Sequence, residues 1–396
     1  MSDRLAIHGG RPVRTSLLPY GRQLIDEDDI RAVVEALRAD LVTTGPTVGE
    51  FERRFAERVG AKYAVAVSSG TAALHAAAFA AGIGPGDEVV TTPLTFVGTS
   101  NAVVYLGGRP VFSDICAGTL NLDPALLETQ LTSRTRAVIP VHFAGQPCDL
   151  DAIHTVARAR GLRVIEDAAH ALGAEYRGQR IGSRSDLVVF SLHPVKHITT
   201  GEGGVVTTND AELAARLRRF RNHGFAVDAK DRQARGLLYA EMVDLGFNYR
   251  LTDIQCALGL SQLGKLDEFV ARRQAVGERY RSELKGLAGL ALPALGDGVR
   301  HAWHLFPVLL ELERLAVDRA TIFAALRAEN IGVTLHYVPA YWHPYYERLG
   351  YRRGLCPRAE AISERIMTLP IFPAMRDGDV EDVVAALRKV LGHYLR

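Results

Sequence analysis

The chain has 396 residues, 47% of them hydrophobic and 23% charged, a composition that is ordinary for a globular protein and excludes disordered and fibrous classes. Its length exceeds the size at which one hydrophobic core usually stops growing, so we expect a large domain and a smaller one. The net charge of +2 gives no electrostatic reason to expect a nucleic-acid partner, which leaves a small molecule as the default ligand.

The N-terminal residues and the cysteines bear on the compartment in which the chain works. Residues 1–6 lack an apolar stretch, and no run of about 18 uncharged apolar residues occurs in the chain. The four cysteines are too far apart to suggest a zinc site or a disulfide framework: Cys116, Cys148, Cys256 and Cys356. We therefore predict a cytoplasmic protein with no membrane segment and no metal.

Residues 60 to about 210 alternate short β-branched runs with helical patterns such as Thr71 to Ala81 and Leu150 to Arg160. This alternation predicts an α/β domain built on a mostly parallel sheet, with its ligand beyond the carboxyl ends of the strands. The seven predicted strands contain residues 64–67, 88–91, 110–112, 137–141, 164–167, 187–190 and 205–207.

The pattern changes after Asn209 and predicts a second, smaller α+β domain. An irregular segment at 225–239 indicates a mobile loop, and one long helix over residues 252–285 would bridge the two domains. The remaining elements are apolar runs at 304–310 and 333–337 and helices near 321–330 and 380–391. We place the large domain, with its N-terminal arm, at 1–260 and the small domain at 261–396.

Three polar groups follow strands in the large domain. Ser69, Gly70 and Thr71 open a helix directly after a strand, where free amides and the helix dipole suit a phosphate; an ordinary helix cap is the alternative. Asp167 ends a strand and is followed by His170, with a helix cap and a core hydrogen bond as the alternatives. A carboxylate buried there needs a cation as partner.

Lys196 follows the next strand and precedes a glycine-rich turn. A free lysine, with a pKa near ~10.4, is a poor nucleophile at neutral pH unless burial or a neighbouring cation lowers that value. Taken alone, Lys196 could be a surface lysine beside a turn. Taken with the phosphate loop and Asp167, it indicates an amine that holds an aldehyde cofactor.

The chain resembles the DegT/StrS-type nucleotide-sugar aminotransferases. The resemblance extends over nearly the whole chain and rests on the segments Leu18-Pro19-Tyr20, Thr43-Thr44-Gly45-Pro46, Ser69-Gly70-Thr71, Thr92-Pro93-Leu94-Thr95-Phe96-Val97, Glu166-Asp167-Ala168-Ala169-His170, Lys196, Phe220-Arg221-Asn222-His223-Gly224 and Gly246-Phe247-Asn248-Tyr249-Arg250-Leu251-Thr252-Asp253. It implies the type I fold of the pyridoxal phosphate-dependent aspartate aminotransferases, with a seven-stranded sheet in the large domain.

The resemblance also implies roles for individual residues. Lys196 would form a Schiff base with pyridoxal 5'-phosphate, Asp167 would pair with its ring nitrogen, and His170 would lie near its phenolic oxygen. Phe96 would pack on the ring, although a plain core aromatic is an open alternative. The phosphate contacts would be Ser69, Gly70, Thr71 and Ser191, with Asn248 reaching the phosphate held by a neighbouring subunit, which implies a homodimer with shared sites.

Within the family, the segments at 193–204 and 336–346 are most similar to enzymes that make UDP-4-amino-4,6-dideoxy-N-acetyl-β-L-altrosamine on the route to pseudaminic acid. The implied reaction transfers the amino group of L-glutamate to a UDP-linked 4-keto-6-deoxy-N-acetylhexosamine, contacted by Tyr20, Thr43, His336 and Tyr337. Other dTDP-linked or 3-keto sugars are the alternative substrates. A sugar dehydratase would have histidine in place of Lys196, and a non-catalytic regulatory protein of the same fold is the third interpretation.

Overall fold

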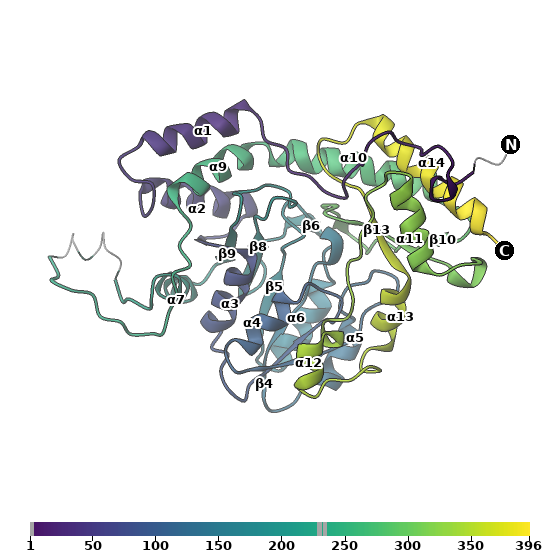
Figure 1. Ribbon diagram of the computed structural model, residues 1–396. Coiled ribbons are helices and arrows are strands. Elements are labelled where there is room, and N and C mark those ends of the chain that lie inside the picture. Colours follow the sequence, from purple (N-terminus) through teal and green to yellow (C-terminus); the bar gives the residue numbers. More distant parts are fainter. Residues whose placement is uncertain (1–3, 228–231, 233–235) are drawn as a thin grey trace.

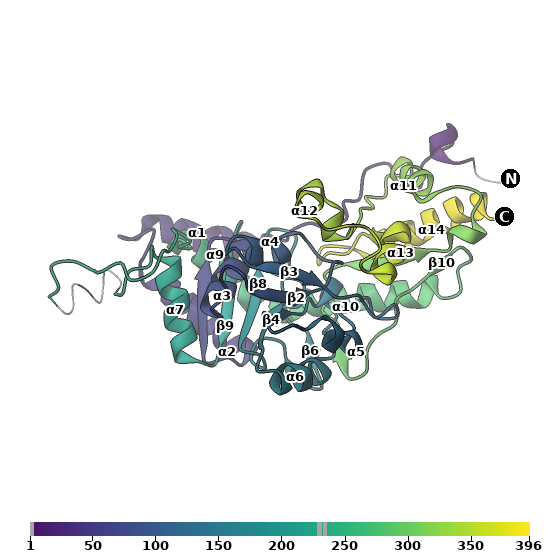
Figure 2. The same ribbon diagram turned by 90° about the horizontal axis from the view of Figure 1, so that it is seen from below.

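The computed structural model describes residues 4–227, 232 and 236–396. The described residues form an α/β unit on a central sheet and a C-terminal unit that lies to one side of it (Figures 1 and 2). Part of the loop predicted at 225–239 falls outside the described residues. Within the described part of the chain, no helix combines the length and apolar character needed to cross a membrane.

The central sheet contains all seven predicted strands, in the order β1-β9-β8-β5-β4-β2-β3. Among the described strands of this sheet, only β9 runs antiparallel to its neighbours. The predicted α/β class with a mostly parallel sheet is therefore confirmed. The strands are β1 (Tyr63–Val67), β2 (Glu88–Thr91), β3 (Arg109–Phe112), β4 (Thr135–Ile139), β5 (Arg163–Asp167), β8 (Leu187–Ser191) and β9 (Gly204–Thr208).

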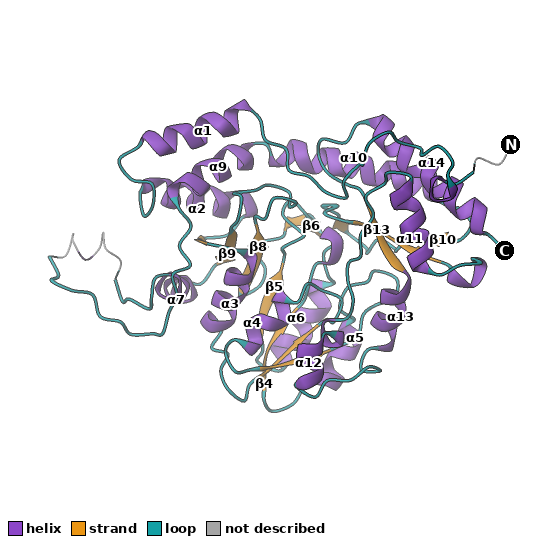
Figure 3. Ribbon diagram, viewed as in Figure 1, coloured by secondary structure: helices purple, strands orange, loops and turns teal. Residues whose placement is uncertain are grey.

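Helices cover both faces of this sheet (Figure 3), which explains why its strands read as nearly continuous apolar runs. Alternate side chains of each strand enter different cores: Val189 of β8 packs with α3 and α7, and Phe190 packs with α2 and α6. The helices of this unit are α1 (Glu27–Arg38), α2 (Pro46–Val59), α3 (Gly70–Ala80), α4 (Gly98–Val104), α5 (Pro124–Leu127), α6 (Leu150–Ala159) and α7 (Ala211–Arg221).

The C-terminal unit packs helices around the small sheet β10-β12-β13. Its predicted apolar run at 304–310 forms β12, whereas the run at 333–337 contributes only a bridge from Thr334 to Thr368. Its elements are β10 (Leu290–Ala291), β12 (Phe306–Leu310), α11 (Arg319–Ala328), α12 (Pro344–Arg348), α13 (Pro357–Arg365), β13 (Ile366–Leu369) and α14 (Asp377–Tyr394).

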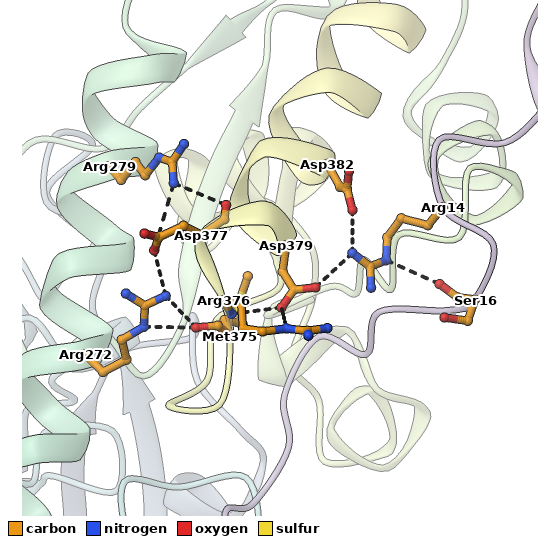
Figure 4. A network of polar contacts seen from close by, with 9 residues as sticks. All are labelled: Arg14, Ser16, Arg272, Arg279, Met375, Arg376, Asp377, Asp379 and Asp382. Atoms are coloured by element: carbon orange, nitrogen blue, oxygen red, sulfur yellow. Dashed lines mark hydrogen bonds and ion pairs between the residues drawn. The ribbon is translucent and has the colours of Figure 1, made fainter.

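The N-terminal arm packs against this C-terminal unit. Leu5 and Leu18 are buried in its core, and Arg14 pairs with Asp379 at 2.9 Å and with Asp382 at 2.6 Å at the start of α14 (Figure 4). The predicted division of the chain into domains at 1–260 and 261–396 stays a prediction. That division places the N-terminal arm in the large domain, although Leu5 and Leu18 of the arm pack in the core of the C-terminal unit.

The long helix predicted over 252–285 is wrong, because two helices occupy this segment: α9 (Asp253–Gly264) and α10 (Leu266–Leu284). Lys265 separates them with φ −99° and ψ −1°, and its amine pairs with Asp26 and Asp29 at the start of α1. Gly264 favours a break, because glycine is a poor helix former. The break lets α9 follow the sheet while α10 continues into the C-terminal unit.

The remaining short elements connect these layers. Strand β11 (Val299–Arg300) pairs with β6 (Glu175–Tyr176), which forms a hairpin with β7 (Gln179–Arg180), and this small sheet joins the two units. The 3-10 helices are η1 (Ala6–His8), η2 (Glu128–Gln130), η3 (Phe143–Gly145), η4 (Leu312–Arg314) and η5 (Ala340–Trp342).

Replacing Phe190 by alanine is expected to destabilise the large unit by about 3–5 kcal/mol, because it opens a cavity in a filled core. Phe190 is fully buried on β8, with its ring centroid 5.3 Å from that of Phe55. Leu349→Ala, at a residue 44% exposed, should stay within about 0.5 kcal/mol of wild type. Urea denaturation measures both changes, and equal midpoint shifts would contradict the expected packing.

Candidate active site

A cavity of about 860 Å³ opens at the carboxyl ends of β5 and β8, where a ligand of this kind of sheet binds. The C-terminal unit supplies its opposite wall. The cavity brings together every predicted site residue except Thr43 and Asn248: Tyr20, Ser69, Gly70, Thr71, Phe96, Asp167, His170, Ser191, Lys196, His336 and Tyr337.

Asp167 is the last residue of β5 and is almost fully buried. Its Oδ2 atom accepts a hydrogen bond from Thr99 Oγ1 at 2.7 Å, and its Oδ1 atom accepts one from the Ala169 amide at 3.1 Å. Burial raises the pKa of the carboxyl, while these two hydrogen bonds and Lys196 act in the opposite direction. Asp167 caps no described helix, and no ion pair ties it to a cation of the described residues, so it can receive a cationic ligand.

Lys196 lies in the turn after β8, and its amine is part of the cavity wall rather than the protein surface. The Nζ atom lies 3.3 Å from His304 Nε2. Burial lowers the pKa of this amine, Asp167 opposes that effect and Arg273 adds to it, and together they bring the pKa to about 8. More of the amine is therefore unprotonated near neutral pH than in an ordinary lysine, as a nucleophile requires.

His170 stands beside Asp167, and its Nε2 atom lies 3.3 Å from the Tyr337 hydroxyl. The two rings are nearly parallel, at 15°, with centroids 6.2 Å apart. Burial, reinforced by Lys196, holds the pKa of His170 well below its ordinary value, so the imidazole is neutral. Its Nδ1 atom is buried and has no partner within the described residues, which leaves one polar atom for a ligand.

The N-terminus of α3 forms the end of the cavity that suits an anion. Ser69 caps the helix by accepting from the Ala72 amide at 3.0 Å, while the Gly70 and Thr71 amides donate to no group of the described chain. A Cβ atom on Gly70 would lie 2.9 Å from Ser191 Cβ, so glycine lets α3 approach β8 closely. The helix-cap alternative is confirmed for Ser69, and it leaves the neighbouring amides available.

Phe96 is 58% exposed and reaches over the cavity from the segment before α4. Its ring centroid lies 6.5 Å from that of Tyr337. The alternative that Phe96 is a plain core aromatic is therefore wrong, and the ring is available to stack on a planar ligand.

Tyr20, His336 and Tyr337 form the far wall of the cavity. His336 Nδ1 contacts Thr368 Oγ1 at 3.0 Å, and the Tyr20 and His336 ring centroids are 5.6 Å apart. Burial lowers the pKa of His336 to about 3 and raises that of Tyr337. The wall is thus neutral, polar and aromatic, which suits a sugar more than a second anion.

Thr43 and Asn248 lie outside the cavity, and both are exposed. Thr43 forms an isolated bridge with Thr252, and Asn248 forms one with Asn222. The role predicted for Asn248 requires a second subunit, so a single chain leaves it a prediction. The contact predicted for Thr43 is likewise not formed within one chain.

Sequence reasoning missed Thr99, His304 and Arg273. Thr99 lies three residues after Phe96, inside a helix start that gave no separate signal. His304 belongs to an apolar run that indicates a strand, and Arg273 belongs to the polar pattern of a helix. Each is revealed only by its contacts: with Asp167, with the Lys196 amine, and with the Lys196 backbone.

Comparisons with known proteins agree with this arrangement. The profile of the DegT/DnrJ/EryC1/StrS aminotransferase family matches residues 23–388. The spore coat polysaccharide biosynthesis protein SpsC of Bacillus subtilis is 44% identical over 381 residues, which cover 96% of this chain and 98% of that protein.

Two solved structures are similar over nearly their whole length. PseC of Helicobacter pylori, an aminotransferase involved in the biosynthesis of pseudaminic acid, has a TM-score of 0.89 and 29% identity, covering 96% of this chain and 100% of that one. Spr1654 of Streptococcus pneumoniae, solved in its PLP form, has a TM-score of 0.89 and 30% identity, with the same coverage.

Proposed function

The chain belongs to the DegT/DnrJ/EryC1/StrS aminotransferase family, and from this premise we propose that it transfers the amino group of L-glutamate to a keto-sugar nucleotide with pyridoxal 5'-phosphate as cofactor. The observation that carries the proposal is one cavity that joins an amine of lowered pKa, a buried carboxylate and a helix N-terminus. These are the three groups that an aldehyde, a ring nitrogen and a phosphate require.

The residues present fit this cofactor. The buried Asp167 carboxylate needs a cation and would take the protonated ring nitrogen, while the Gly70 and Thr71 amides would take the phosphate with Ser191. The unpartnered His170 Nδ1 atom would contact a polar group at the edge of the cofactor ring, and the exposed Phe96 ring would stack on its face. Lys196 would hold the aldehyde carbon.

When bound, pyridoxal phosphate withdraws electrons from the carbon that gains or loses the amino group. The chain's own residues would position the reacting groups and move the proton. The Lys196 amine, with a pKa of about 8, would take and return a proton at neutral pH. The Asp167 carboxylate, which accepts a hydrogen bond from Thr99, would hold the ring proton, and the cavity walls would keep both groups in position.

The other interpretations are weaker. A dehydratase of the same family would have histidine where this chain has Lys196. A non-catalytic protein would not need the buried carboxylate or the amine of lowered pKa, both of which cost stability. Incubation of purified protein with pyridoxal phosphate tests the non-catalytic interpretation, because a protein that stays colourless would favour that interpretation.

For the substrate we propose a UDP-linked 4-keto-6-deoxy-N-acetylhexosamine. The likeness to PseC and the wall formed by Tyr20, His336 and Tyr337 support this choice. The test supplies L-glutamate with UDP- and dTDP-linked 3-keto and 4-keto sugars and identifies the aminated product by mass and NMR. Amination of only dTDP-linked or only 3-keto sugars would overturn the substrate but not the reaction.

We also propose that the protein acts as a homodimer in the cytoplasm, with each site completed by the partner. Exposed apolar residues at 237–247 support a covered surface there, beside Asn248: Leu238, Tyr239, Met242 and Leu245 are 63–94% exposed. Mixing Lys196→Ala with Asn248→Ala protein tests this, since hybrid dimers would regain one intact site. Unchanged inactivity of a verified mixed dimer would reject shared sites.

Replacing Thr99 by valine is expected to lower kcat/KM roughly tenfold, the typical loss of a hydrogen bond to a charged group. Because the Thr99 hydroxyl lowers the pKa of Asp167, its loss raises that pKa, and the acidic limb of the pH–rate profile should move to higher pH. Thr99→Ser keeps the hydroxyl and should match wild type. An unmoved acidic limb in the valine variant would contradict this role.

A further inference from the structure

Arg273, in the middle of α10, is a charged side chain with no exposed surface. Within the described chain no carboxylate forms an ion pair with it, and its Nε atom has no hydrogen-bond partner. Burial lowers the pKa of this guanidinium to about 9. A buried charge without a counterion is costly, so Arg273 calls for an explanation beyond packing.

The contacts of Arg273 join the two units at the lysine turn. Its Nη2 atom donates to the carbonyl oxygens of Val195 and Lys196 at 3.3 and 3.4 Å. Its Nη1 atom donates to three carbonyl oxygens of the C-terminal unit, those of Trp303 at 3.2 Å, His304 at 3.3 Å and Ile371 at 3.0 Å. One planar group thus joins the backbone of the lysine turn to the backbone of the C-terminal unit.

Two of these backbone contacts belong to side chains that meet each other. Arg273 holds the carbonyl groups of Lys196 and His304, and the Lys196 amine lies 3.3 Å from His304 Nε2. The three residues therefore close a ring of contacts, in which the guanidinium sets the separation of the two chains that carry the amine and the imidazole.

Resting on the proposed function of Lys196, we propose that Arg273 is a positioning residue for its amine: the guanidinium ties the Lys196 turn to the His304 segment and places a positive charge without a counterion against the Lys196 backbone. The charge favours the unprotonated amine, which is the form that binds the cofactor and accepts a proton. The ties hold this amine against His304 whenever it is free.

Glu202 lines the same cavity, whereas Asp167 and Arg273 are the charged groups that shift the pKa of the Lys196 amine. Asp167 raises the pKa of the amine and Arg273 lowers it. The histidines from the surrounding elements have pKa values lowered by burial, that of His336 to about 3, so they stay neutral where the amine titrates: His170, His197, His304 and His336.

The test measures the amine itself in the full chain freed of cofactor. Competitive labelling with isotopic acetic anhydride at a series of pH values, read by mass spectrometry of the Lys196 peptide, gives its apparent pKa. Wild type should titrate near 8. In the Arg273→Gln variant, which keeps N–H donors and loses the charge, the apparent pKa of Lys196 should be about one unit higher. Arg273→Lys should fall between them.

Arg272 provides the matched control. It precedes Arg273 on α10 and also binds the C-terminal unit, through the Met375 carbonyl oxygen at 2.9 Å and Asp377 at 2.9 Å. Its side chain is 32% exposed and does not contact the lysine turn. Arg272→Gln should therefore leave the titration of Lys196 unchanged while losing comparable interactions with the C-terminal unit.

Three results would overturn the proposal. These are an unshifted Lys196 titration in a folded Arg273→Gln protein, an equal shift in Arg272→Gln, and failure of both Arg273 variants to fold, which would assign Arg273 to folding alone. Thermal melting establishes which variants are folded. Because labelling reads the amine and not turnover, failure to aminate any sugar would reject the proposed function without changing this result.

Discussion

Lys196→Ala is expected to lower the rate of amino transfer by at least ~10³-fold, because the variant lacks both the amine that binds the aldehyde and the group that moves the proton. Water in the cavity cannot replace an amine that is held against His304 with a pKa of about 8. Turnover is followed by product mass, and cofactor binding by the visible absorbance that pyridoxal phosphate gains on attachment to lysine.

Lys62 serves as the control for this substitution. It is an exposed lysine directly before β1 and does not line the cavity, so Lys62→Ala should keep wild-type turnover and colour. A Lys196→Ala protein that retained the absorbance and full turnover would show that another amine does the work, and the proposed function would then lose its central residue.

The sequence predicted the sheet well because buried strands between helices carry a strong signal. Runs of three to five residues rich in β-branched side chains recur between helical patterns, and each forms a strand of the central sheet. The antiparallel direction of β9 was not predictable, because a strand buried on both faces reads alike in either direction. The break at Lys265 was missed because apolar periodicity continues across it and only Gly264 marks it.

The candidate site was predictable to the extent that its residues lie at strand ends. Asp167 and Ser191 end neighbouring strands, so alternation alone brings them to one edge of the sheet. His304 and Arg273 reach the same place through the packing of the C-terminal unit, which depends on contacts more than 70 residues apart in the chain. Local patterns carry no information about such contacts.

Asp167→Asn is expected to reduce kcat roughly 10²–10³-fold, the cost of removing one partner from a buried ion pair. Asparagine keeps the shape and can still accept from Thr99, so the change isolates the charge. Two effects combine. The ring nitrogen of the cofactor would lose the carboxylate that keeps it protonated, and Lys196 would lose the charge that raises its pKa.

The second effect gives Asp167→Asn a signature that simple damage would not produce. Because Asp167 raises the pKa of Lys196 and Arg273 lowers it, Asp167→Asn should move the labelling titration of Lys196 to lower pH, opposite to Arg273→Gln. Glu166→Gln is the control: Glu166 precedes Asp167 on β5, points to the other face and contacts His142 at 2.8 Å. The Glu166→Gln variant should be less stable than wild type but keep its kcat. An equal loss of kcat in both variants, or a higher pKa of Lys196 in Asp167→Asn, would contradict the inference that Asp167 and Arg273 act in opposite directions on the Lys196 amine.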